Sequence, residues 1–395
     1  MSKLSGGGAE HVARNNIECF VNDSNIELAI LTCDASATKM FNLKIFIAKD
    51  FRSLKGVFSK GIGSMYMEYN YRIVRQCLTR FKPDIIHMHD YIPFSPSMLK
   101  AFSEYKVRSL CKIILTHHTF SFLCTNDSLF NYSTSKLCEK CIGKFDKTII
   151  KENCYNSNIG STLKYLQKKR IMYFMGNLID IHVAPSYFMK NMLLKVNNKY
   201  KVEVVYNPCI KNNFQLPYNK KENKIVYFGR ISKEKNILRI VELFDSSCTG
   251  TMQLLIIGNG DQSGELRKIV NNARNRKMIV FKNEFLSTEK LYEEIIDAKY
   301  LILPSVWYEN SPVSIVEAIS LGIVPIVSNI GGMKELVDYF EFGYCFDPYD
   351  DKSFVEIIRN LDNFIHPRPD DKVLVKLNLF TNKQYQKDII SIYNS

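Results

Sequence analysis

The chain lacks any long apolar segment. In 395 residues no stretch of 18 is free of charged side chains, so the sequence predicts no membrane-spanning helix. The first 20 residues lack an apolar centre and a small-residue cleavage site, so no secretory leader is expected. Eleven cysteines, an odd number without such a leader, favour reduced thiols over a disulfide framework. These absences predict a cytoplasmic protein, whose contact with the inner face of a cell membrane would be peripheral.

The net positive charge of the chain lies in its first half. Residues 1–215 hold 30 Lys and Arg against 16 Asp and Glu, a net charge of +14, whereas residues 216–395 hold 23 against 24. The first half is therefore expected to meet an anionic partner, such as an anionic membrane surface or a phosphate-bearing lipid. Solubility charge in a lysine-rich composition is the alternative. Nucleic acid is not expected, because basic and aromatic residues are dispersed rather than arranged along one groove.

Short apolar runs alternate with helical patterns through both halves of the chain. Most runs are continuous rather than alternating, as expected of strands buried on both faces of a parallel sheet. We expect an α/β protein of two doubly wound, Rossmann-like domains, residues 1–207 and 225–381, joined by a linker over 208–224. A helix over 382–395 is expected to pack back on the first domain. The predicted strands span residues 26–33, 43–48, 84–89, 112–116, 180–184, 202–206, 224–229, 253–258, 278–281, 300–305 and 323–328.

The strongest chemical signal is a pair of glutamates in PSVWYENSPVSIVEAISLG (304–322). Ser311 and Pro312 predict a helix cap and a first helical residue, and Gly322 predicts the end of that helix. Glu309 then precedes the helix and Glu317 lies inside it. Two carboxylates so spaced can accept hydroxyl hydrogens at both ends of a nucleotide sugar, while the helix N-terminus faces the diphosphate. Alone, they could equally be surface or capping residues.

Cations and glycines follow other predicted strands. Arg230 and Lys235 come directly after the strand at 224–229, where two cations can neutralise a diphosphate leaving group. Gly258 and Gly260 follow the next strand, and Gly331-Gly332 precedes another helix. Each feature is weak alone, but all lie at strand ends, where an open α/β sheet binds its ligands.

The ordered motifs GGGAE, HHT, GRISKEKN, IIGNGD, PSVWYEN-x7-E and GGMKE resemble the family-4 retaining glycosyltransferases of GT-B fold, of the bacterial surface-polysaccharide type. The resemblance runs from about residue 5 to the C-terminus, and it implies two Rossmann-like domains facing each other across a cleft. It further implies a nucleotide-diphosphate sugar as the donor and no cofactor for catalysis. The chain contains no Asp-x-Asp motif, which argues against the other major glycosyltransferase fold, whose donor is held through a divalent ion.

The resemblance also assigns roles to individual residues. Arg230 and Lys235 would hold the donor diphosphate, Glu309 the donor sugar, and Glu317 the ribose hydroxyls. The remaining donor-binding positions are Gly258 and the backbone amides of Asn310 and Ser311. Two positions depart from the family pattern, since Pro312 has no amide to offer and Asn283 stands where a glycine is common.

The histidines divide into one catalytic candidate and several structural ones. By the resemblance, His118 lines the reaction centre, where it would bond the sugar or handle the proton of the acceptor. His117 falls where an apolar residue is usual and is expected to pack. His87 and His89 also end a predicted strand, and we expect them to be structural.

Four cysteines bracket one polar segment in the pattern C-x13-C-x2-C-x12-C. Cys124, Cys138, Cys141 and Cys154 have the ligand number and type of a structural zinc site. A metal would order a segment too polar to form its own core. Because only one close pair exists, buried or spare thiols are the competing interpretation.

The N-terminus raises a separate question. Gly7 and Gly8 form an acceptor-side loop at the start of a helix, but MSKLS is too short for the strand that precedes this loop in relatives. The sequence therefore predicts an incomplete first strand, which would leave unpaired edges in the first sheet. Either upstream residues supply that strand, or this copy is an impaired or scaffolding homologue.

These features predict a retaining hexosyltransferase that moves sugar from a nucleotide-diphosphate donor to a growing, lipid-linked surface glycan. The competing enzyme class is a nucleotide-sugar 2-epimerase on the same scaffold. Stretches 51–82 and 161–176 mix Lys and Arg with Tyr, Phe and Met. Either stretch could lie on an anionic bilayer, or it could be an ordinary amphipathic helix on the sheet.

Overall fold

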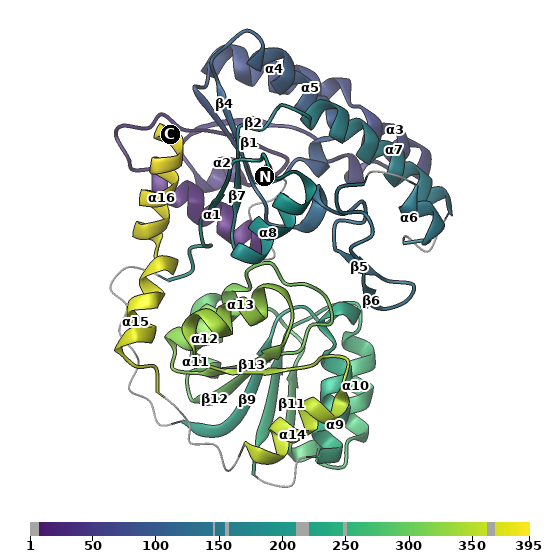
Figure 1. Ribbon diagram of the computed structural model, residues 1–395, viewed down its shortest axis with the longest axis vertical. Coiled ribbons are helices and arrows are strands. Elements are labelled where there is room, and N and C mark those ends of the chain that lie inside the picture. The colour runs from purple at the N-terminus through teal and green to yellow at the C-terminus, as the bar shows by residue number, and fades with distance from the viewer. Residues whose placement is uncertain (1–7, 145–146, 155–157, 211–220, 248–250, 362–367) are drawn as a thin grey trace. The chain divides into compact units, whose positions relative to one another are not determined.

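The computed structural model describes residues 8–144, 147–154, 158–210, 221–247, 251–361 and 368–395 (Figure 1). Its chain divides into two compact units. The first unit comprises residues 1–134, 138–208 and 382–395, and the second comprises 135–137 and 209–381. No helix among the described residues is both long and apolar enough to cross a bilayer. Of the predicted linker, residues 211–220 lie outside the described residues, as does Gly7 of the predicted acceptor-side loop.

The first unit contains a four-stranded parallel sheet. Its order is β3 (Ile85–Met88), β4 (Lys112–Thr116), β7 (Ile181–Ala184) and β8 (Val202–Val204). All four residues of β7 are buried, as expected of a central strand covered on both faces. In the described part of the chain, β1 (Ala29–Thr32) and β2 (Lys44–Ile47) pair with each other as a separate parallel sheet.

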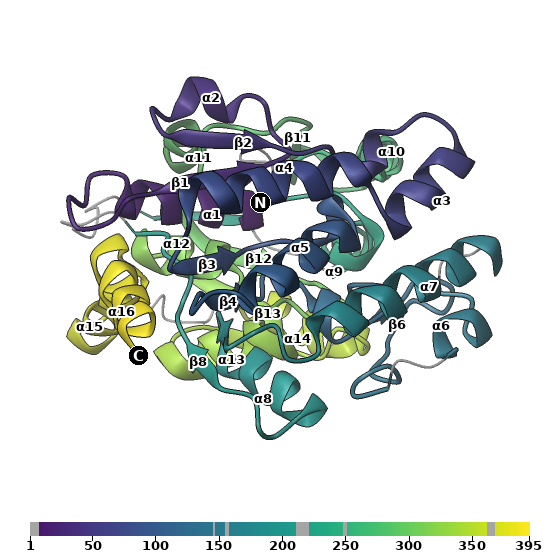
Figure 2. The same ribbon diagram turned by 90° about the horizontal axis from the view of Figure 1, so that it is seen from above.

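Helices cover the sheet of the first unit. Helix α4 packs on α5, and α5 and α3 both pack on α7, so that these helices lie side by side (Figure 2). The helices of this unit are α1 (Gly8–Phe20), α2 (Ala37–Met40), α3 (Val57–Met65), α4 (Glu68–Phe81), α5 (Pro96–Lys106), α6 (Thr148–Lys151), α7 (Asn158–Met175), α8 (Tyr187–Val196) and α16 (Asn382–Asn394).

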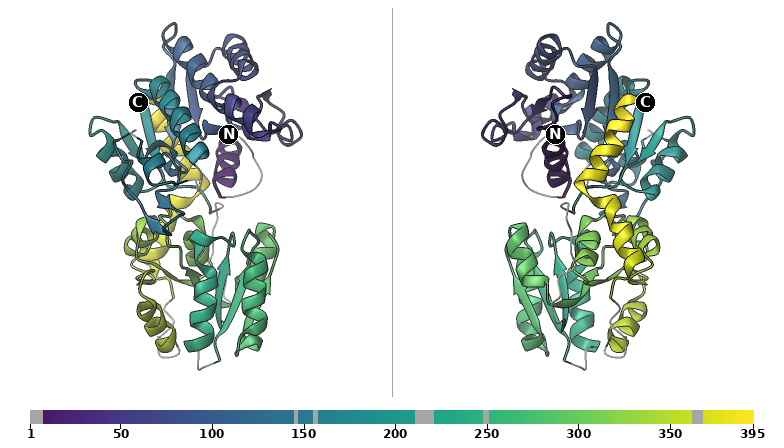
Figure 3. Two further views of the ribbon diagram at one scale, coloured as in Figure 1. Left: turned by 90° about the vertical axis from the view of Figure 1, so that its right-hand side faces the viewer. Right: turned by 90° about the vertical axis from the view of Figure 1, so that its left-hand side faces the viewer.

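The last helix of the chain belongs to the first unit. Tyr385, Ile389 and Ile392 of α16 pack in one apolar cluster with Phe20 of α1 and with residues of β4 and β7. Figure 3 shows the backbone of α16 in yellow, ending at the C-terminus. The Asn16 side-chain amide donates to the Tyr385 hydroxyl, which satisfies the polar end of a buried ring. The C-terminal segment is therefore an integral layer of this unit.

The second unit contains a six-stranded, wholly parallel sheet. Its order is β11 (Ile279–Lys282), β10 (Gln253–Ile257), β9 (Glu222–Phe228), β12 (Ala298–Leu303), β13 (Val324–Ser328) and β14 (Tyr344–Phe346). The chain builds outward from β9 through β10 to β11, then returns to the other side of β9. The order therefore reverses between β9 and β12, and ligands of open α/β sheets bind at such a reversal.

Helices alternate with these strands along the chain. They are α9 (Ile237–Ser247), α10 (Ser263–Asn272), α11 (Thr288–Ile295), α12 (Val313–Ser320), α13 (Gly331–Phe340), α14 (Asp351–Asn360) and α15 (Asp371–Leu377). Single turns of 3-10 helix and the two-residue strands β5 (Phe130–Asn131) and β6 (Lys136–Leu137) complete the described elements. The prediction of two Rossmann-like α/β halves is confirmed.

One detail of the prediction is wrong. Helix α12 begins at Val313, and Pro312, not Ser311, occupies the cap position with extended backbone. Proline suits either position because neither requires its missing amide hydrogen. The helix ends as expected, since Gly322 adopts φ 69°, a left-handed conformation that glycine reaches without strain.

Candidate active site

Three loops of the second unit meet at the carboxyl ends of its central strands. The amide of Ile231, after β9, donates to the carbonyl of Asn259, after β10, at 3.0 Å. The amide of Val306, after β12, donates to the carbonyl of Glu234 at 2.9 Å. The loop after β9 is thus joined by backbone hydrogen bonds to the loops after both of its neighbouring strands, β10 and β12, and these loops carry the predicted donor-binding residues.

Lys235 and Glu309, both predicted from the sequence, are in direct contact. The Lys235 Nζ lies 2.5 Å from Glu309 Oε1, and their side chains are only 16% and 13% exposed. Trp307 Nε1 and Ser305 Oγ also donate to this oxygen, at 2.6 and 2.8 Å. Burial alone would raise the pKa of Glu309, but the charge of Lys235 and these hydrogen bonds outweigh it, so the pKa is lowered. Glu309 is therefore an ionised carboxylate held in one position.

Arg230 extends from the same loop with its guanidinium toward solvent. Its Nη2 donates to Glu234 Oε1 at 2.8 Å, while its side chain remains 56% exposed. Glu234 is buried and also accepts from Ser232 Oγ at 2.8 Å. The carboxylate of Glu234 thus orients one cation, and Arg230 keeps donors available for an anionic ligand.

Glycines allow the loops to approach one another. A Cβ on Gly258 would lie 1.8 Å from the carbonyl oxygen of Gly229, and one on Gly332 would lie 1.9 Å from that of Asn310. No other residue fits such distances without movement of the backbone. Asn310 is buried, and the amide of Gly332 donates to the Glu309 carbonyl at 2.8 Å. Gly258 and Asn310 are thereby placed at the loops that carry Arg230 and Glu309.

Glu317 lies inside α12, and its environment differs from that of Glu309. The hydroxyl of Tyr292 on α11 lies 3.4 Å from Glu317 Oε1. Burial raises the pKa of Glu317 to about 7, and the hydrogen bond from Tyr292 offsets this only in part. At neutral pH this carboxyl is therefore divided between its charged and neutral forms.

In the first unit, His118 is paired with a second histidine. His118 follows β4 and His89 follows β3, and His89 Nδ1 lies 2.9 Å from His118 Nε2 with the rings stacked at 15°. Burial lowers the pKa of His118 to about 4 and that of His89 well below its usual value. His118 is thus neutral at pH 7, so it would act on a ligand by hydrogen bonding rather than as a cation.

The other histidines are held within the fold. Buried His117 Nε2 lies 2.9 Å from His182 Nδ1, which agrees with the packing role expected of it. His87 bonds Thr116 Oγ1 at 2.7 Å through one ring nitrogen and the Tyr393 hydroxyl at 2.8 Å through the other. His87 therefore ties β3 to β4 and to α16.

The four cysteines of the predicted zinc site lie in one region of the first unit. Cys124, Cys141 and Cys154 are buried and Cys138 is partly buried. A hydrogen bond with Cys141 lowers the pKa of Cys124 to about 6. Among the described residues, however, no three His, Cys, Asp or Glu side chains converge as ligands for a metal ion. Zinc binding stays a prediction.

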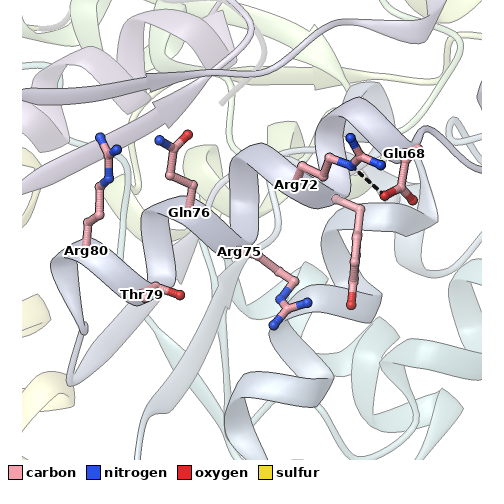
Figure 4. A pocket seen from close by; sticks show the side chains of 7 residues that line it. Glu68, Arg72, Arg75, Gln76, Thr79 and Arg80 are labelled. Atoms are coloured by element: carbon pink, nitrogen blue, oxygen red, sulfur yellow. Dashed lines mark hydrogen bonds and ion pairs between the residues drawn. The ribbon is translucent and has the colours of Figure 1, made fainter.

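A shallow groove runs along helix α4, with a volume of about 400 Å³ (Figure 4). Arg72 in this groove donates to Glu68 at 2.8 Å. None of its lining residues is among the predicted catalytic or donor-binding residues. The groove is lined by Glu68, Tyr71, Arg72, Arg75, Gln76, Thr79 and Arg80.

Sequence reasoning missed Ser305 and Trp307, the two further donors to Glu309, and also Glu234, His89 and Tyr292. Glu234 lies inside the recognised GRISKEKN motif, and its position four residues after Arg230 was the available signal. His89 was expected to be structural, and only the meeting of β3 and β4 brings it to His118. Tyr292 carries no sequence signal, because 25 residues separate it from Glu317.

Two family models together match most of the chain. The model described as Glycosyltransferase Family 4 matches residues 6–209, and that described as Glycosyl transferases group 1 matches residues 210–363. An uncharacterised 42.6 kDa protein of the cps region of Klebsiella pneumoniae is 23% identical over 81% of this chain and 76% of its own. A sucrose synthase of Solanum tuberosum is 23% identical over 45% of this chain, and the match spans about a quarter of that protein, 24%.

Solved structures share the fold over nearly the whole length. The lipopolysaccharide outer core galactosyltransferase WaaB has a TM-score of 0.66 at 18% identity, covering 98% of this chain and 96% of its own. Anabaena HepE, solved with UDP and glucose, has a TM-score of 0.69 at 12% identity, covering 100% and 98%. With the family models, this similarity shows that the chain belongs to glycosyltransferase family 4 and is a retaining, nucleotide-sugar-dependent glycosyltransferase of GT-B fold.

Proposed function

We propose that this enzyme moves a hexose from a UDP-sugar to a lipid-linked glycan acceptor during synthesis of a bacterial surface polysaccharide. The Klebsiella relative comes from a cps region, and WaaB is named as a lipopolysaccharide galactosyltransferase. HepE was solved with UDP-glucose as well as with UDP and glucose. The identity of the base, the sugar and the acceptor rests on these similarities.

The observation that carries the proposal is the Lys235–Glu309 contact at the sheet reversal, with Arg230 beside it. A diphosphate offers several anionic oxygens to Lys235 and Arg230, and each charge-assisted hydrogen bond contributes roughly 1.5–3 kcal/mol. When the diphosphate engages Lys235, one acceptor site on Glu309 becomes available for a sugar hydroxyl. Donor binding would thus prepare Glu309 for its role.

The reaction retains the configuration of the sugar. The acceptor oxygen forms its bond to the anomeric carbon on the face from which the UDP phosphate oxygen leaves. That phosphate takes the acceptor proton, so no carboxylate nucleophile is required. Arg230 and Lys235 would stabilise the charge that develops on the leaving diphosphate. Neutral His118 would hold the sugar or acceptor hydroxyl by a hydrogen bond.

The test is release of UDP from a panel of UDP-, GDP-, ADP- and dTDP-sugars, measured with and without a bacterial membrane extract. We expect one hexose donor to give UDP release that depends on the extract and transfers label to a lipid fraction. Glu309→Ala and Lys235→Ala should each lower this rate by at least a hundredfold. Arg267→Ala, an exposed cation on α10, is the matched control and should keep the wild-type rate.

Other results of the same assay would contradict the proposal. Formation of a free epimeric sugar without transfer would make the protein an epimerase of the same scaffold. Release of UDP that the Glu309 and Lys235 variants leave unchanged would show that the proposed site is not the site of reaction.

A further inference from the structure

Helix α7 is cationic, with two of its cations facing the protein and two facing solvent. It contains Lys164, Lys168, Lys169 and Arg170 and no acidic residue. Lys164 Nζ lies 2.5 Å from Asp127 Oδ2, and buried Lys168 lies 4.0 Å from the other oxygen of that carboxylate. These two contacts hold α7 against the segment after β4. Lys169 and Arg170 point to solvent.

The same solvent face of α7 carries a line of large apolar side chains. Ile159, Leu166 and Tyr173 are 73%, 42% and 82% exposed. They are spaced seven residues apart, close to two helical turns, so they lie along one stripe. Lys169 and Arg170 interrupt this stripe between Leu166 and Tyr173. An exposed stripe of this kind calls for a covering partner, because isolated exposed apolar residues are common but aligned ones are not.

Helix α3 extends this face. Its Gly61 approaches Leu163 of α7 closely enough that a Cβ there would lie 3.7 Å from Leu163 Cδ1. The next residue, Ile62, is 56% exposed, and Lys60 is exposed beside it. We call the outer faces of α3 and α7 together the α3–α7 surface. Figure 2 shows these two helices next to each other at one edge of the first unit.

Interactions between cations and aromatic rings join the α3–α7 surface to neighbouring helices. Arg170 lies over the ring of Tyr66 at 5.8 Å, and Lys100 of α5 lies over the same ring at 5.6 Å. Lys100 and Arg75 also approach the ring of Tyr71, at 4.9 and 5.7 Å. Arg75 lines the groove along α4, so basic and aromatic groups continue onto that helix.

We propose that the α3–α7 surface docks on an anionic lipid bilayer. Exposed Ile and Leu side chains can enter the acyl boundary, tyrosine rings suit the headgroup level, and the flanking cations attract acidic headgroups. A nucleic acid would favour stacking aromatic platforms, and Ile159, Ile62 and Leu166 offer none. This proposal extends the proposed function. It rests on that function only in one respect, the lipid-linked acceptor.

Membrane attachment of this kind depends on two separable contributions. Each Lys or Arg near an anionic surface is worth about fivefold in the partition coefficient, and salt weakens this part. The apolar stripe supplies a second contribution to membrane binding, which salt does not weaken. Binding should therefore require acidic lipid, decline at high salt, and respond to changes in either group of residues.

The experiment is flotation of the full-length chain with vesicles, without donor or acceptor. We expect flotation with phosphatidylcholine vesicles that contain about one third phosphatidylglycerol, and none with pure phosphatidylcholine. Lys169→Glu/Arg170→Glu should lower the partition coefficient at least tenfold. Leu166→Ser/Tyr173→Ser should lower it comparably and should leave a residual binding that high salt abolishes.

Matched controls change the same chemistry elsewhere. Arg267→Glu/Lys268→Glu reverses an adjacent exposed pair on α10, and Val107→Ser/Leu110→Ser removes two apolar side chains that are 86% and 105% exposed after α5. Both should float like the wild type. Because Arg170 also contacts Tyr66, Lys60→Glu/Lys169→Glu is a second charge variant that keeps this contact, and thermal unfolding checks all variants.

Three outcomes would overturn the docking proposal: no flotation of the wild type, equal flotation with neutral vesicles, or equal losses in the control variants. A different outcome would contradict the proposed function. A protein that floats but transfers no sugar would contradict that function and leave the docking surface supported. A protein that transfers sugar but never floats would contradict only the docking surface.

Discussion

At the scale of single residues, the two glutamates of the motif 304–322 turn out to be chemically different. Glu309 receives one cation and two further donors, so it is ionised, whereas Glu317 receives one tyrosine hydroxyl and has its pKa raised to about 7. Spacing alone could not distinguish them, because the difference arises from Lys235, 74 residues away, and from Tyr292.

The Lys235–Glu309 pair leads to the first prediction. Lys235→Met should leave a largely buried carboxylate without its cation and lower the free energy of unfolding by about 3 kcal/mol. Lys235→Met/Glu309→Leu removes both charges and should recover part of that loss. Urea unfolding of both variants measures this, and a double variant as unstable as Lys235→Met, or less stable, would refute it.

Glu317 leads to the second prediction. A carboxyl with a raised folded-state pKa holds its proton more tightly when folded, so stability declines as the pH rises from about 4.5 to about 7. Glu317→Gln should therefore stabilise the protein at pH 8 by roughly 2–3 kcal/mol and leave it unchanged near pH 4. Exposed Glu265→Gln on α10 is the control.

The raised pKa of Glu317 also has a consequence for donor binding, which should favour the charged form of this carboxyl, whereas folding favours the neutral form. If ionised Glu317 accepts the ribose hydroxyls, the KM for the donor falls as the pH rises through about 7. The Glu317→Gln variant should lose this dependence and have a higher KM at pH 8. A pH profile of KM that is unchanged in the variant would assign Glu317 a structural role only.

At the scale of elements, the strands were the most predictable part of the fold. Continuous apolar runs located β1 to β4 and β7 to β13. The most deeply buried of these strands are β4, β7, β10, β12 and β13, as expected of strands covered on both faces of a parallel sheet. The edge strand β14 (Tyr344–Phe346) was not predicted, because Gly343 and Asp347 flank its apolar residues on both sides. The predicted start of α12 lies one residue before the observed start at Val313, because serine and proline each suit neighbouring positions at a helix N-terminus.

The site was predictable where chemistry lies within one motif and not where strands bring distant residues together. Arg230 and Lys235 could be found because they follow β9 in one loop. The pairing of His89 with His118 depends on β3 lying beside β4, and 29 residues separate the two rings. Sequence alone contains both histidines but not their contact.

Close packing of the loops gives the third prediction. Gly258→Ala would place a Cβ 1.8 Å from the Gly229 carbonyl oxygen, so we expect loss of donor binding and destabilisation by about 2 kcal/mol or more. Gly264→Ala in α10 meets no atom within 4 Å and should be neutral or stabilising by about 0.5–1 kcal/mol. Thermal unfolding and nucleotide titration compare them, and equal behaviour would contradict the packing described.

At the scale of the whole molecule, the histidines whose pKa values the described residues establish all lie in the first unit. His87, His89, His117, His118 and His182 all have lowered pKa values, with burial as the main cause. Groups whose folded-state pKa is lowered take up protons more readily when unfolded. The contribution of these histidines to stability is therefore fully present above about pH 6.5 and is lost as the pH falls toward about 4.

The fourth prediction follows from this distribution. Between pH 7.5 and 5.5 the first unit should lose about 1 kcal/mol for each of these histidines, whereas the second unit should gain stability as Glu317 takes up a proton. Hydrogen exchange resolved by peptide measures this, with β4 and β7 reporting on the first unit and β9 and β12 on the second. Equal loss of protection in both units would contradict the assignment.

The helix α16 has a consequence for how the protein is made. Its residues Tyr385, Ile389 and Ile392 complete the apolar cluster of the first unit, although they follow the whole second unit in the sequence. The second unit, by contrast, is a nearly uninterrupted stretch that emerges whole before α16 does. The portion translated first must therefore wait until α16 has been synthesised to close its core. During that wait its exposed apolar surface is a substrate for chaperones, and release of the chain before α16 is made would leave only the second unit complete.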